Sequence, residues 1–303
     1  MRGFSFVEMI VSLSILLVVI GAIFALVNPA RGMFATQNEL LEMQQRLRVA
    51  ADALGRDVLV AGAGNRGYFA AVAPHRRGME SADPPGSFFD DRLSVVFVPV
   101  QAPETTVSSP TDGGGAVLAS PQPDCPSGDP LCGFRANMLV AVFDETGAYD
   151  TIRLSNVTID PPALLYEGST LSKSYAAGAR VAQVETATYW LRSGSVSQLM
   201  KYDGRQTDVP LADNIVALRM DYFADADPAD ASSPFTLLGA ARLTDGPWRP
   251  DPVAPNRFDA DLLRVRRVRM TIRARANRIF LTAPIADHEI IVDIAPRNLN
   301  LLQ

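Results

Sequence analysis

One carboxylate, that of Glu8, stands inside an apolar stretch near the start of the chain. Apolar residues lie on both sides of it, and residues 9–30 carry no charge. A carboxylate near hydrocarbon costs about 2.5–3.5 kcal/mol on insertion scales and marks a function or a specific partner. The chemistry it offers is ion pairing, because a buried charge is tolerated only beside an opposite one. The simpler alternative places Glu8 at the headgroup boundary, where the cost is small.

A second candidate pair is Cys125 and Cys132, the only cysteines of the chain. Disulfides form outside the reducing cytoplasm. We therefore expect this pair to close a small loop if the later part of the chain lies on the outer face of a membrane. The alternative is half of a metal site. No second cysteine pair or nearby histidine completes such a site, and the two histidines, His75 and His288, lie far apart.

Seven arginines fall within residues 264–278. From Val268 onward, apolar and basic residues alternate, which predicts a strand with one basic face. That face carries Arg267, Arg269, Arg273 and Arg275. It could dock an acidic partner subunit or, less favourably, DNA. The favoured alternative is a solvated strand whose charges protect it from edge-to-edge aggregation.

Three carboxylates, those of Asp225, Asp227 and Asp230, are spaced as in some calcium loops. The glycine and the terminal glutamate of an EF-hand are missing, so a polar loop is the better reading. No G-x-S-x-G or H-E-x-x-H motif is present. We therefore expect no enzyme, no cofactor and no metal site.

The composition sets broad limits on the class of protein. The 303 residues are 48% hydrophobic and 20% charged, with a formal net charge of −5, which excludes a wholly disordered chain. The mild acidity argues against a protein that mainly grips nucleic acid. With 21 glycines and 22 prolines, the chain is expected to be rich in turns.

The elements that must position these residues begin with a long helix. The uncharged run 9–30 would span about 33 Å as a helix, enough to cross a bilayer. It is longer than the apolar region of a signal peptide, so we expect an uncleaved anchor with a cytoplasmic amino terminus. Pro29 and Gly32 could kink the helix. Apolar positions at spacings of three and four then predict its continuation to residue 61, and Gly62 and Gly64 end it. The expected core positions are Leu40, Met43, Leu47, Ala50, Ala51, Leu54, Val58 and Ala61.

The remainder of the chain predicts β-structure. Residues 68–134 form a turn-rich insert with one clear strand at 93–100. Sequential strands with short polar connections favour an antiparallel sheet, so the expected fold class is α+β. Further strands are expected at 138–143, 149–157, 180–191, 198–202, 215–223, 265–276 and 289–294.

The start of the chain resembles the prepilin signal of type IV pilins and type II secretion pseudopilins. The resemblance rests on Gly3-Phe4-Ser5-Phe6-Val7-Glu8, preceded by Arg2 and followed by the uncharged helix. It implies that a prepilin peptidase cleaves between Gly3 and Phe4 and methylates the new amino terminus of Phe4. Glu8 then becomes the fifth residue. Its carboxylate would pair with the ammonium of a neighbouring subunit and set the register of helix packing.

Phrases nearer the end of the chain resemble PilW-type minor pilins. They include Thr188-Tyr189-Trp190-Leu191, the segment 210–218, the arginine-rich strand and the segment 295–301. The resemblance implies a pilin-like α+β fold and a minor pilin that joins a tip or priming complex of a type IV pilus. The implied domains are a leader 1–3, a membrane or filament-core half 4–30, an amphipathic half 31–64, and a periplasmic or extracellular head 65–303.

The implied partners are other minor pilins, the major pilin, an adhesin-like tip protein, the prepilin peptidase and the inner-membrane assembly platform. The expected location is the inner membrane and, after assembly, the pilus. Two alternatives remain open. One is a J-type minor pseudopilin of a type II secretion system. The other is a signal-anchored periplasmic enzyme or binding protein in which Glu8 is incidental.

Overall fold

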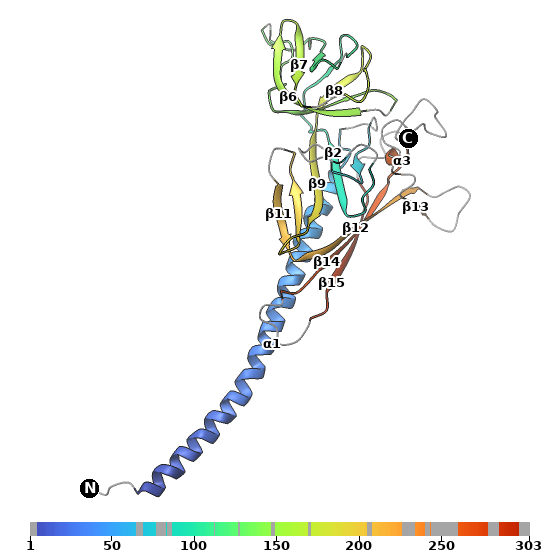
Figure 1. Ribbon diagram of the computed structural model, residues 1–303. Coiled ribbons are helices and arrows are strands. Elements are labelled where there is room, and N and C mark those ends of the chain that lie inside the picture. The colour runs from blue at the N-terminus through green and yellow to red at the C-terminus, as the bar shows by residue number, and fades with distance from the viewer. Residues whose placement is uncertain are drawn as a thin grey trace.

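The computed structural model describes most of the chain. The described residues are 5–64, 69–76, 83, 87–111, 113–126, 128–146, 149–168, 171–204, 208–225, 234–239, 243, 260–277 and 285–296. Within them, one long helix carries a head of antiparallel strands (Figure 1). The expected α+β class is therefore confirmed.

The helix α1 (Phe6–Val60) contains 55 residues and is about 80 Å long at 1.5 Å per residue. It runs unbroken past Pro29 and Gly32, where the sequence suggested a kink, and Figure 1 shows it as a gently curved rod. The head covers only its second half. Seven of the eight expected core positions are buried there, and Leu40 is partly buried.

Two sheets hold this half of α1. The first has the order β1 (Val72–Ala73), β2 (Arg92–Phe97), β9 (Glu185–Arg192), β10 (Gln198–Tyr202) and β11 (Asp208–Asp213). The second has the order β13 (Phe235–Leu238), β12 (Ile215–Asp225), β14 (Arg267–Ala274) and β15 (His288–Ile294). All their pairings are antiparallel. The helix contacts β2, β11, β14 and β15, so both sheets share one core with it. A short helix, α3 (Ala260–Leu263), precedes β14.

A third sheet lies at the far end of the head from the amino terminus (Figure 1). Its order is β3 (Glu104–Thr106), β8 (Arg180–Gln183), β5 (Leu139–Phe143), β6 (Tyr149–Ile159), β7 (Pro162–Tyr166) and β4 (Ala116–Leu118). A bridge between Val107 and Ala119 joins the two edge strands, with backbone hydrogen bonds of 2.8 and 2.9 Å beside it. The sheet thus closes into a small barrel, which removes its open edges.

This barrel corrects two expectations from the sequence. The predicted strand 180–191 is two strands, with β8 in the barrel and β9 in the five-stranded sheet. The insert 68–134, in which one clear strand was expected, holds four strands in its described residues: β1 and β2 belong to the five-stranded sheet, and β3 and β4 to the barrel. Three-residue strands such as β3 and β4 carry too short an alternation to be read from sequence.

Contacts on several sides fix the barrel to the rest of the head. The chain passes from β8 to β9 through the single buried residue Val184. The ring of Phe69 lies 5.1 Å from Phe143 and 5.0 Å from Tyr149, measured between centroids. Tyr149 also donates a 3.3 Å hydrogen bond to the carbonyl of Ala70. The end of the head is therefore positioned relative to α1.

One polar cluster joins α1 to the five-stranded sheet. The carboxylate of Asp57 accepts a 2.6 Å hydrogen bond from the hydroxyl of Tyr189 and lies 2.6 Å from the ammonium of Lys201. Burial, and then the charge of Asp57, raise the pKa of Tyr189, so its hydroxyl stays protonated and donates. The cluster thus links the helix to β9 and β10.

We expect Asp57→Ala to lower the free energy of unfolding by about 1–3 kcal/mol, because it leaves the mostly buried Tyr189 hydroxyl and the Lys201 ammonium without this acceptor. Asp57→Asn should cost less, since the amide oxygen still accepts from Tyr189. Thermal unfolding of the full chain in detergent measures both. The control is Asp52→Ala, an exposed position on the same helix. Equal melting of the Asp57→Ala and Asp52→Ala proteins would contradict the prediction.

Candidate assembly site

The first half of α1 presents uncovered apolar surface. Its most apolar window of 18 residues has a mean hydropathy of 3.0, and none of that window is buried. Phe6, Leu17 and Leu26 are each more than 60% exposed. The helix is long and apolar enough to cross a membrane. The hydroxyls of Ser12 and Ser14 donate to the carbonyls four residues earlier, so both polar groups are satisfied within the helix.

Glu8 sits at the start of this apolar half. Its Oε2 atom accepts a 3.0 Å hydrogen bond from the backbone N–H of Ser5. This is one of the two bonds of a capping box, in which the side chain of a glutamate three residues after the N-cap residue accepts from the backbone N–H of that residue. Here the N-cap residue is Ser5. The Ser-x-x-Glu spacing is the sequence signal that would have predicted the contact. Within the described part of the chain, no cation forms an ion pair with Glu8, and the expected cleavage residues Gly3 and Phe4 lie outside that part.

The two cysteines form a disulfide in the structure, as the sequence suggested. The loop that they close contains Leu131, which is buried in the barrel core together with Phe134 just beyond it. An ion pair of 3.3 Å between Arg135 and Asp129 also spans this region. The disulfide loop therefore borders the barrel core rather than forming a separate lobe.

The alternation expected around β14 is present, with Val268, Met270, Ile272 and Ala274 buried on one face. On the other face the arginines have acidic partners from the chain itself. Arg269 makes two hydrogen bonds, of 2.8 and 3.0 Å, to Asp293, and these raise the pKa of Arg269 and lower that of Asp293.

The other three arginines of that face are also engaged. Arg275 and Arg273 lie 3.1 and 3.9 Å from Asp287. The guanidinium of Arg267 is placed between the rings of Phe223 and Phe235, 4.4 and 4.3 Å from their centroids. The four arginines therefore belong to a surface of mixed charge, and docking of an acidic partner there stays a prediction.

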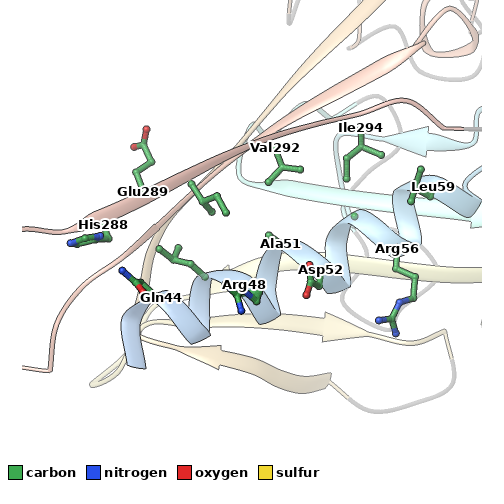
Figure 2. Close-up of a pocket in the computed structure, with 13 residues that line it drawn as sticks. Gln44, Arg48, Ala51, Asp52, Arg56, Leu59, His288, Glu289, Val292 and Ile294 are labelled. Atoms are coloured by element: carbon green, nitrogen blue, oxygen red, sulfur yellow. The ribbon is translucent and has the colours of Figure 1, made fainter. Parts of the chain in front are cut away.

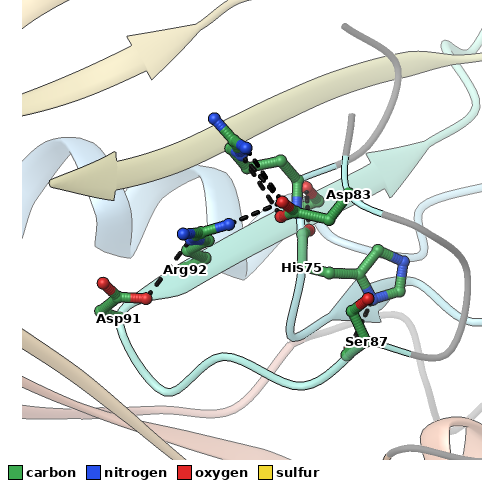
Figure 3. A network of polar contacts seen from close by, with 7 residues as sticks. His75, Asp83, Ser87, Asp91 and Arg92 are labelled. Carbon is green, nitrogen blue, oxygen red and sulfur yellow. Dashed lines mark hydrogen bonds and ion pairs between the residues drawn. The ribbon is translucent and has the colours of Figure 1, made fainter. Parts of the chain in front are cut away.

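A buried polar network fixes the segment before β2 (Figure 3). Ser94 donates a 2.7 Å hydrogen bond to the backbone carbonyl of His75. Its hydroxyl oxygen also lies 2.7 Å from that of Thr188, so Thr188 is the donor of that second bond. The ring Nδ1 of His75 donates to the carbonyl of Ser87 at 3.1 Å. These bonds join the segment before β2 to β2 itself, and β2 to β9.

Asp83 belongs to the same region (Figure 3). Its carboxylate is 3.0 Å from a guanidinium nitrogen of Arg76 and 2.6 Å from one of Arg92. Burial raises the pKa of Asp83, but hydrogen bonds from Arg76 and the contact with Arg92 outweigh it, so the pKa is lower than usual. In the described residues, no three histidine, cysteine or acidic side chains are grouped to hold a metal ion. Residues 226–230 of the acidic loop lie outside the described part.

A groove of about 750 Å³ runs between α1 and β15 (Figure 2). Its helix side carries exposed polar residues one turn apart, namely Gln44, Arg48, Asp52 and Arg56. Its floor is apolar and contains the small residues Ala51 and Gly55. No sequence pattern predicted this groove, because it depends on where β15 lies against the helix.

The fold and these surfaces define a class: an α+β head carried on a helix that is long and apolar enough to span a membrane. Comparisons with protein-family models, with curated proteins and with solved structures give no match to this chain.

The low pKa of Asp83 predicts a pH dependence of stability. A carboxyl whose folded-state pKa lies below its unfolded value stabilises the fold above the unfolded pKa of about 3.9, and this contribution is lost as the pH falls through the folded-state pKa. Asp83→Asn should therefore lower the melting temperature at pH 7 by a few degrees, about 2–4 °C for each kcal/mol lost in a head of this size. The difference from the unsubstituted protein should shrink below pH 4. Asp91→Asn, at a more exposed ion pair with Arg92, is the control. A difference that is constant from pH 7 to pH 3 would contradict the prediction.

Proposed function

We propose that this chain is a minor pilin of the PilW type, which joins the tip or priming complex of a type IV pilus. What supports the proposal is one continuous helix with two kinds of surface. The first half of α1 is apolar and uncovered, and the second half is the core of the head. An uncovered apolar helix can be shielded by a bilayer or by other apolar helices, and a filament subunit must use both in turn.

The position of Glu8 adds to this support. It lies at the first turn of the uncovered half and caps its own helix through Ser5. Cleavage after Gly3 would keep the Phe4–Ser5 peptide bond and therefore the Ser5 N–H that Glu8 accepts. Glu8 would then have further oxygen lone pairs for the ammonium of a neighbouring subunit. A charge-assisted bond in an apolar bundle fixes the register of helices that could otherwise slide.

The function proposed is assembly rather than catalysis. Before assembly, the uncovered half of α1 spans the inner membrane. During assembly it enters the filament core, while the head contacts other subunits. A type II secretion pseudopilin would use the same physics. Deletion of the gene separates the two, because a minor pilin is needed for surface fibres and twitching and a pseudopilin for export of secreted proteins.

The mature amino terminus tests the proposal directly. We expect mass spectrometry of the protein from its native membrane to find a chain that begins with N-methyl-Phe4. Gly3→Ala should leave residues 1–3 attached, since the peptidase of this family cuts after glycine. An intact Met1 on the unsubstituted membrane protein would refute the proposal and favour a plain signal anchor.

Substitution of Glu8 tests its role in register. Glu8→Ala and Glu8→Lys should still insert in the membrane, because the apolar run 9–30 is unchanged, but should enter filaments at least several-fold less. Immunoblots of sheared filaments and of membranes give the two quantities. Glu42→Ala, at an exposed position in the second half of α1, is the control. Normal incorporation of both Glu8 variants would show that the carboxylate has no such role.

A further inference from the structure

The outer edge of β15 is open. This strand is the last of its sheet, and β14 occupies one of its two edges. No strand in the described part of the chain pairs with the other edge. An edge strand presents unpaired backbone N–H and C=O groups, which a further strand can bind. The usual protection by proline is missing, since residues 288–294 contain none.

The groove continues this open edge toward α1. Ile290, Val292 and Ile294 line it from the strand, and Figure 2 shows Val292 and Ile294 directed toward the helix, with Glu289 directed away. A Cβ atom on Gly55 would lie 2.8 Å from a terminal methyl of Ile294, so helix and strand approach closely at that end. A strand added beside β15 would direct alternate side chains into this apolar space.

The opposite face of the sheet shows which charges such a strand needs. Across the sheet, Asp221 is opposite Arg269, and Arg269 is opposite Asp293. Arg273 is likewise opposite Glu289. In the row of Asp221, Arg269 and Asp293, acidic and basic residues alternate from strand to strand. Both this row and the pair of Arg273 with Glu289 end on an acidic residue of β15 at the open edge. Directly opposed residues of unlike charge stabilise a pair of strands, whereas like charges destabilise it.

We propose that β15 and the adjoining groove bind an extended segment of another polypeptide in which basic and apolar side chains alternate. Its backbone pairs with the open edge of β15. Its apolar side chains fill the groove above Ala51 and Gly55, and its basic side chains lie opposite Glu289 and Asp293. This is β-strand addition, in which backbone bonds give affinity and alternate side chains give specificity. The proposal does not depend on the chain being a pilin.

A second copy of this chain fits the edge less well. If two β15 strands paired antiparallel about Ile291, Glu289 of each would lie opposite Asp293 of the other. Two pairs of like charges would then face one another, which disfavours the contact. Ile291 itself is 59% exposed between these two carboxylates, so a basic partner strand would also cover an apolar side chain.

Two peptides of nine residues test the proposal on the full chain in neutral detergent. One alternates arginine with valine, and the other alternates glutamate with valine. Fluorescence anisotropy should show saturable binding of the arginine peptide, which weakens with added salt, and no binding of the glutamate peptide. Glu289 is exposed and makes no ion pair in the described part of the chain. Glu289→Lys should therefore fold normally and weaken binding about tenfold, and Glu289→Gln should weaken it less.

Hydrogen exchange provides the second measurement. The amides of residues 288–294 should gain protection when the arginine peptide binds, because strand addition satisfies their free backbone groups. Glu185→Lys, an equal charge reversal at an exposed position of β9, should leave binding and protection unchanged. Equal binding of the two peptides, failure of the arginine peptide to bind, or protection outside β15 would each overturn the proposal. So would protection of β15 in the free protein together with dimers in light scattering, which would assign the edge to a second copy.

Discussion

The physical constraint behind this structure is that the head covers only half of its longest helix. Met43, Leu54 and Val58 are fully buried between the two sheets, whereas the apolar side chains of the first half have no cover in the described chain. At roughly 25 cal/mol for each Å² of apolar surface, such a helix is strongly driven toward lipid or toward other helices. The first half of α1 therefore needs a bilayer or the apolar helices of other subunits around it, and the assembly function that we propose uses both.

The buried and half-buried carboxylates of the head join its secondary-structure elements to one another. Asp57 joins the helix to two strands, Asp83 holds Arg76 and Arg92, and Asp293 holds Arg269. Each carboxylate meets a cation or a hydroxyl within 3.0 Å. Charged side chains that the sequence alone would assign to partner binding therefore mostly pair with other residues of the same chain. The outer edge of β15 differs, because no strand in the described part of the chain pairs with its backbone there.

The closed barrel at the end of the head and the four-stranded sheet near α1 differ in whether they leave a strand edge unpaired. In the barrel, the bridge from Val107 to Ala119 leaves no edge strand, so strand addition has no site there. The four-stranded sheet ends at β15 beside a groove. Strand addition is therefore proposed at β15 and not in the barrel.

The sequence by itself determined the long helix, the core positions of its second half and the alternation of β14, because each is a local pattern that repeats every two or every three to four residues. It also indicated the disulfide, because Cys125 and Cys132 are the only cysteines of the chain. It did not determine that residues 180–191 serve two sheets, that three-residue strands close a barrel, or that Asp287 and Asp293 neutralise the arginines. Those features join residues far apart in the chain, and their partners are set by which strands lie side by side. Only the tertiary structure decides that order, and with it which edge and which charges remain for a partner.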